Sequence, residues 1–260
     1  MNFPHPSLFT PVIDHYLPEP QASLLNGIIF GTPLKTSKAF YEELKTVGLL
    51  HLVVLSGINI TMLSAIITSL TIFLGKKSSL LITMVCIVLF IYFVGFQAPI
   101  IRAGVMGILA LVGTLFGRKY TALYGFLLAG LITAIFWPQW LTTVSFQLSY
   151  GATLGIILFS SSKKTNAFMQ ELRPSLAAQV FTVPILFFKF HQISLIAPIS
   201  NILVSFTIVP LMIFGFLTAI LGKINVILGV IPAFICYCIL SYILFVIHGL
   251  SKLPFAQIRF

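Results

Sequence analysis

The chain has 260 residues, of which 58% are hydrophobic and only 8% are charged. An ordinary soluble domain carries about a quarter of its residues as charged side chains. A soluble core of this length could not bury so much apolar surface, so the composition excludes a soluble globular protein. It predicts an all-α, polytopic helical membrane protein.

The acidic residues lie almost entirely near the N-terminus. From His51 onward Glu171 is the only acid, against twelve basic residues, which gives 12 − 1 = +11 for this part of the chain. Loops on the cytoplasmic side of a membrane collect Lys and Arg, and this is the ordinary reason for such an excess. The basic residues could instead line a path for a polyanion. The charge totals do not decide between these two interpretations.

Residues 1–50 are predicted to form an extracytoplasmic arm. Its first twenty residues contain five prolines and are expected to be extended. The stretch QASLLNGIIFGT, at 21–32, is apolar but short, which predicts a surface-lying or re-entrant helix. Residues 36–50 are amphipathic and predict a helix along the membrane surface, with Ser37 as its N-cap and Gly48 at its end.

Residues 51–260 are predicted to form the transmembrane domain, with about eight apolar segments by the length rule of roughly 20 residues per span. The segments at 103–117 and 174–189 are short for a complete span. With the 75–78 loop placed inside, the inside loops hold eight basic residues, and both termini fall on the non-cytoplasmic face. The expected segments are 51–74, 79–101, 103–117, 120–137, 140–160, 174–189, 193–221 and 224–250.

Polar residues recur within these apolar segments, where lipid would not accept them. Each one could simply join helices, since such bonds are worth about 0.6–2 kcal/mol. As a set, however, they offer donors, acceptors and one cation but no carboxylate, whereas proton and cation paths usually need Asp or Glu. We therefore expect an anion or a polar polymer to pass along them. The residues are His51, Ser56, Gly57, Asn59, Arg102, Gln147, Ser149, Gln179, Thr182, Gln192 and Asn201.

Within this set, His51, Ser56 and Asn59 share one arc of a helix, and Gly57 lets another backbone approach closely. Arg102 is expected at the junction of two apolar segments. The stretch VLSG, at 54–57, resembles the serine motif of rhomboid-type proteases but lacks its first Gly. There is no P-loop and no metal-ligand cluster in the sequence, so we expect no enzyme activity, no cofactor and no metal.

Five motifs, in order, resemble those of the ComEC/Rec2 family of DNA-uptake channels, in its competence domain. The resemblance covers about residues 17–221. Residue Asn59 stands where the family has His, and Asn cannot titrate. The chain shows no segment like the OB-type or metallo-β-lactamase domains of longer members, so a stand-alone competence domain is expected. The motifs are LPEPQASLLNGIIFG, HLVVLSGIN, PIIRAGVM, SFQLSYGATLG and AAQVFTVPILFFKFHQISLIAPISN.

The resemblance implies a channel that passes transforming single-stranded DNA across the bacterial inner membrane during natural competence. It implies that the polar residues line or shape the path. The implied partners are single-stranded DNA, membrane lipid, and separate DNA-receptor, nuclease and ATPase proteins, with a homo-oligomer as an open option. Two alternatives remain: a transporter of another anionic or amphiphilic solute, and a membrane scaffold whose polar residues only join helices.

Overall fold

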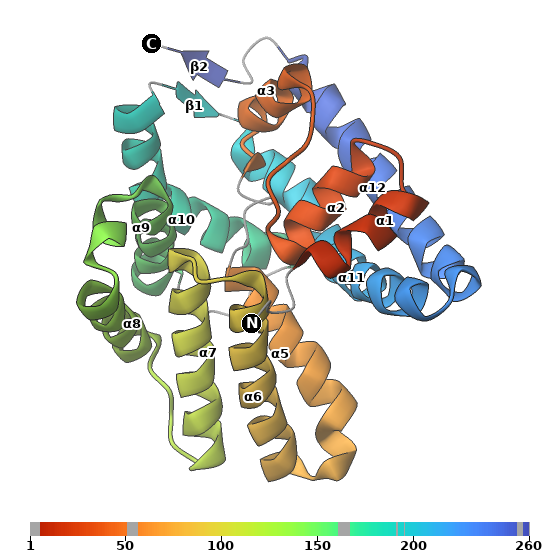
Figure 1. The fold of residues 1–260 in the computed structure, drawn as a ribbon. Coiled ribbons are helices and arrows are strands. Elements are labelled where there is room, and N and C mark those ends of the chain that lie inside the picture. Colours follow the sequence, from red (N-terminus) through yellow and green to blue (C-terminus); the bar gives the residue numbers. More distant parts are fainter. Residues whose placement is uncertain are drawn as a thin grey trace. The chain divides into compact units, whose positions relative to one another are not determined.

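Figure 1 shows the fold in a computed structural model, in which residues 6–50, 57–160, 167–190, 192–194, 196–253 and 257–259 are described. This part of the chain is almost wholly helical, as expected. Its two short strands, β1 (Gln192–Ser194) and β2 (Gln257–Arg259), pair antiparallel, with Ile193 opposite Ile258. The chain divides into two compact units. One contains α1 to α3, α11, α12 and the strands, and the other contains α5 to α10.

The helices of the first unit are α1 (Thr10–Tyr16), α2 (Gln21–Phe30), α3 (Lys38–Thr46), α11 (Ala197–Ile224) and α12 (Val226–Ser251), with the short 3-10 helix η1 (Pro6–Leu8). Those of the second unit are α5 (Gly57–Thr71), α6 (Lys76–Val94), α7 (Ala98–Leu115), α8 (Ala122–Phe136), α9 (Val144–Phe159) and α10 (Ala167–Phe190), with η2 (Ile72–Leu74) and η3 (Pro138–Thr142).

Four of the described helices are long and apolar enough to cross a bilayer: α6, α7, α11 and α12. The other apolar helices, α2, α5 with η2, α8 and α9, are shorter. Each of the expected apolar segments corresponds mainly to one helix from α5 to α12, but length and hydropathy single out only these four as candidate spans. The segment expected at 103–117 is longer than predicted, because α7 already begins at Ala98.

A seam of hydroxyl groups joins α5 to α6 in the second unit. The side-chain oxygens of Thr68 and Thr83 lie 3.0 Å apart, and those of Thr71 and Ser79 lie 2.8 Å apart. The Ser79 hydroxyl also lies 3.1 Å from the Thr68 carbonyl oxygen. Hydrogen bonds of this kind hold helices together in lipid, where apolar packing gives little net attraction. These polar residues therefore serve helix packing.

In the first unit, the short apolar helix α2 is buried among other helices. Every residue from Ala22 to Phe30 is buried, because α1, α11 and α12 pack around this helix. Gly215 on α11 makes room for the Ile29 side chain, which a Cβ at Gly215 would strike. Whether this segment lies along the membrane surface or re-enters the membrane stays a prediction.

The N-terminal segment is not wholly extended, since residues 10–16 form α1. Pro11 occupies the first turn of α1, where a missing backbone N–H costs nothing. The Tyr16 hydroxyl donates a hydrogen bond to the Val226 carbonyl at 2.6 Å, and the Asn26 amide donates to the Asp14 carboxylate at 2.7 Å. The expectation of an extended arm missed this helix, because prolines at helix starts look like prolines in extended chain.

The amphipathic helix α3 begins and ends as predicted. The Ser37 hydroxyl accepts a hydrogen bond from the Phe40 N–H at 3.3 Å, and Gly48 follows the helix in the left-handed region, with φ of +73°. The Ser200 hydroxyl donates to the Val47 carbonyl at 2.7 Å, and the Ser194 hydroxyl donates to the Thr46 carbonyl at 2.7 Å. Residues far along the chain thus satisfy the carbonyls that a helix end leaves open.

Substituting Gly48 tests this junction. A Cβ at Gly48 would lie 2.6 Å from the Ala197 Cβ, in addition to the strain of a positive φ, which is worth about 1–2 kcal/mol. Gly117, at φ +65°, is the matched control, because a Cβ there meets nothing within 4 Å. We expect Gly48→Ala to lower the melting temperature and membrane abundance clearly more than Gly117→Ala. Equal losses would show that the contact with Ala197 contributes nothing.

Candidate functional site

Arg102 lies inside α7, in its second turn, and not between two apolar segments as the sequence suggested. The break between α6 and α7 comes earlier, at Gly95, whose φ of +102° suits glycine alone. Pro99 then occupies the first turn of α7, where proline is favoured. A candidate membrane-spanning helix therefore carries the cation, and the Arg102 backbone is part of that helix.

Two hydroxyl groups of α9 hold the Arg102 guanidinium. Its Nε donates a hydrogen bond to the Ser149 Oγ at 3.1 Å, and its Nη1 donates to the Thr153 Oγ1. Ser149 and Thr153 are four residues apart, so they lie on one face of α9. The Thr153 hydroxyl in turn donates to the Ser149 carbonyl at 2.9 Å. We call Arg102, Ser149 and Thr153 the guanidinium site.

Glycine at the start of α5 allows this site to close. A Cβ at Gly57 would lie 3.1 Å from the Arg102 Nη2 and 3.4 Å from the Ala103 Cβ. The first distance is tighter than an ordinary contact, so a larger residue would press on the guanidinium. The sequence predicted a close approach at Gly57, and in the structure the neighbouring group is the arginine side chain.

No carboxylate neutralises Arg102 among the described residues, where its polar partners are the two hydroxyls. Residues 57–190 contain one acid, Glu171. Burying a cation costs several kcal/mol unless other groups compensate. Neutral hydroxyls satisfy the N–H groups but leave the positive charge in place. The guanidinium site is therefore suited to a passing anion, which would supply the missing negative charge.

The other predicted residues of this unit lie outside the guanidinium site. Gln147 on α9 and Gln179 on α10 are half-buried, and neither side chain makes a hydrogen bond to the described residues. The Thr182 hydroxyl donates to the Ala178 carbonyl of its own helix at 3.1 Å. Asn59 is buried on α5. A lining role for these residues stays a prediction.

The remaining predicted residues belong to the first unit or are not described. Asn201 is half-buried on α11, and Gln192 lies in β1. His51 and Ser56 lie outside the described residues. The structure thus brings Gly57, Arg102 and Ser149 together out of the predicted set.

Sequence reasoning missed Thr153, the second hydroxyl on the guanidinium. Its spacing of four residues from Ser149 was the available signal, because that spacing puts both on one helix face. Threonine in a membrane helix usually bonds its own preceding carbonyl, so its presence alone indicates nothing. Only the register of α7 against α9 shows that Thr153 also meets an arginine.

Changing Thr153 to valine tests the guanidinium site. The variant keeps the side-chain shape but leaves an arginine N–H without its acceptor, which costs about 1–3 kcal/mol. We expect a fall in melting temperature in detergent of about 2–4 °C for each kcal/mol. The control is Thr114→Val on α7, since the Thr114 hydroxyl bonds only its own helix, at the Ala110 carbonyl. Equal melting temperatures for the two variants would contradict the site.

Comparison with known proteins places the chain among relatives. The sequence profile of the family described as "Competence protein" matches residues 28–260. "ComE operon protein 3" of Bacillus subtilis (strain 168) is 27% identical over 196 residues, which cover 73% of this chain and 25% of that protein. The chain thus spans about a quarter of the length of this relative. No solved structure matches.

These matches agree with the long apolar helices in describing a multi-pass membrane protein. The profile covers the whole second unit, including the guanidinium site, and the first unit from residue 28 onward. The chain belongs to the competence protein family.

Proposed function

We propose that this chain passes transforming single-stranded DNA across the bacterial inner membrane during natural competence. One observation carries the proposal. The Arg102 guanidinium lies on an apolar helix and is held by hydroxyl groups, and no carboxylate of the described residues pairs with it. Membership of the competence protein family and the match to "ComE operon protein 3" support it.

DNA suits the guanidinium site because each nucleotide brings one phosphate charge. Arg102 would pair with phosphates in turn, while its two hydroxyl partners keep the guanidinium oriented when no phosphate is present. Conduction requires contacts weak enough for the ligand to leave. The neutral Gln147, Gln179 and Asn59 would contact the strand without trapping it. We propose that this chain conducts the DNA and does not cleave it.

The proposed orientation follows from the loop charges. The first turn of α6 carries Lys76 and Lys77, and the loop after α7 carries Arg118 and Lys119. Placing both on the cytoplasmic side puts both termini on the non-cytoplasmic face. We propose that separate proteins capture the DNA, degrade its second strand and supply energy.

Transformation assays test the proposal through Arg102. The host is a naturally competent bacterium that lacks its own family member, and the chain is expressed alone or fused to the host's external domains. We expect Arg102→Gln to lower transformation at least about tenfold, since a lost charge-assisted contact is worth about 1.5–3 kcal/mol. Arg118→Gln removes an exposed arginine from a loop and is the matched control.

Immunoblots of membranes must show equal insertion of both variants. Arg102→Lys is a second variant in case Arg102→Gln does not fold, because it keeps the charge but cannot make the two-point contact of arginine. We expect an intermediate loss from Arg102→Lys. Normal transformation by well-inserted Arg102→Gln would overturn the role of the guanidinium. If the unaltered chain inserts well but never restores transformation, a transporter of another anionic or amphiphilic solute becomes the better account.

A further inference from the structure

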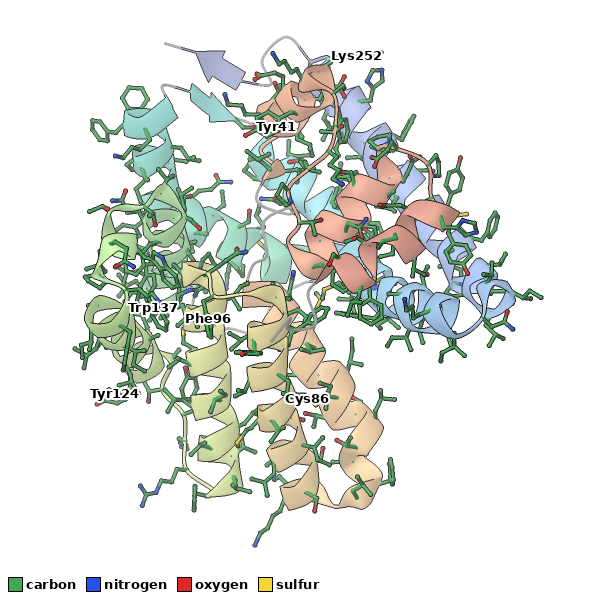
Figure 2. The ribbon with its side chains drawn as sticks, in the orientation of Figure 1. Tyr41, Cys86, Phe96, Tyr124, Trp137 and Lys252 are labelled. Atoms are coloured by element: carbon green, nitrogen blue, oxygen red, sulfur yellow. The ribbon has the colours of Figure 1, made fainter. Side chains whose placement is uncertain are left out.

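Three aromatic rings form a stack in the unit that contains α5 to α10. The Phe96 and Trp137 ring centroids lie 5.9 Å apart, with 27° between the rings. The Trp137 and Trp140 centroids lie 4.9 Å apart, with only 5° between the rings. Figure 2 labels Phe96 and Trp137, which come from the turn before α7 and the end of α8. We call Phe96, Trp137 and Trp140 the aromatic stack.

The aromatic stack lies at the same end of this unit as the guanidinium site. Phe96 precedes the first residue of α7 by two positions, and Arg102 lies four residues beyond that first residue, or about 6 Å along the helix axis. Trp140 precedes the first residue of α9 by four positions, and Ser149 lies in the second turn. Since Arg102 bonds Ser149, α7 and α9 begin at one end.

The stack is open to its surroundings at Phe96, while Trp137 and Trp140 are half-buried. Phe96 is 50% exposed, and its neighbour Tyr92, whose ring centroid lies 6.2 Å away, is 45% exposed. The charged group at this end of the unit is the Arg102 guanidinium, which has no carboxylate partner among the described residues. A ligand that fits both features has flat apolar faces and repeated negative charges.

We propose that the aromatic stack binds the bases of single-stranded DNA while Arg102 contacts its phosphates, so that this end of the unit is where the strand enters. The inference rests on the proposed function and adds a base-binding surface to it. On the orientation given above, the Phe96 turn and η3 face the non-cytoplasmic side, from which DNA arrives. Stacking on aromatic rings tolerates any sequence, as a transforming strand requires.

Anchoring in the lipid headgroups is the competing role for these tryptophans, because Trp is enriched at membrane interfaces. An anchor needs rings in contact with lipid, not with one another. The near-parallel packing of Trp137 on Trp140, at the end of the unit that also holds the Arg102 guanidinium, favours a base-binding surface.

Intrinsic fluorescence isolates the stack, because the chain has two tryptophans and both belong to it. The full chain in lipid nanodiscs is titrated with oligothymidylate and with an abasic oligonucleotide of equal length. We expect oligothymidylate to quench the fluorescence and to bind about tenfold more tightly than the abasic strand. Phe96→Leu should remove most of that preference. The matched control is Phe116→Leu, an exposed Phe at the other end of α7, and it should keep the preference.

Arg102→Gln separates this inference from the proposed function, because it should weaken both oligonucleotides alike. Equal, Arg102-dependent binding of the two strands would overturn the base-binding surface and leave the proposed function standing. Quenching by brominated lipids without quenching by DNA would also overturn the surface and identify a headgroup anchor. If neither strand bound, both proposals would be overturned.

Discussion

A half-buried guanidinium without a carboxylate partner among the described residues is the constraint on which the site depends. Desolvating a cation costs several kcal/mol, and the chain offsets this with the Ser149 and Thr153 hydroxyls. Their spacing of one helical turn matches the fork of Arg102, and the absence of a side chain at Gly57 leaves room for it. Because hydroxyls satisfy the N–H groups without cancelling the charge, the site remains attractive to an anion. A carboxylate in the same place would have made a closed structural ion pair.

The polar residues of the apolar helices therefore serve two different purposes. Thr68, Thr71, Ser79 and Thr83 bond one another between α5 and α6, and Ser200 caps carbonyls at the end of α3. Such bonds are worth about 0.6–2 kcal/mol each and explain packing without any ligand. The Arg102 contacts differ because they hold a charge. Composition alone cannot separate the two purposes, since both use Ser and Thr at similar depth.

Local signals predicted the local features well. The Ser37 cap, the Gly48 terminus and the helical class are confirmed, because each depends on neighbours in sequence or on total composition. Features that depend on packing were missed. Hydropathy does not show that Pro99 starts a helix, so Arg102 was placed between segments. The burial of α2 depends on α11 and α12, and the contact of Thr153 depends on the register of α9 against α7.

The central claim is that the strand passes beside Arg102, and photocrosslinking during DNA uptake tests it most directly. A photoreactive amino acid at Met106, four residues from Arg102 on the same face of α7, would be illuminated while competent cells import labelled DNA. The same probe at Tyr124, which is 73% exposed on α8, is the control. The account predicts that Met106 crosslinks to the incoming strand and Tyr124 does not. Active transformation with no crosslink at Met106 would contradict it.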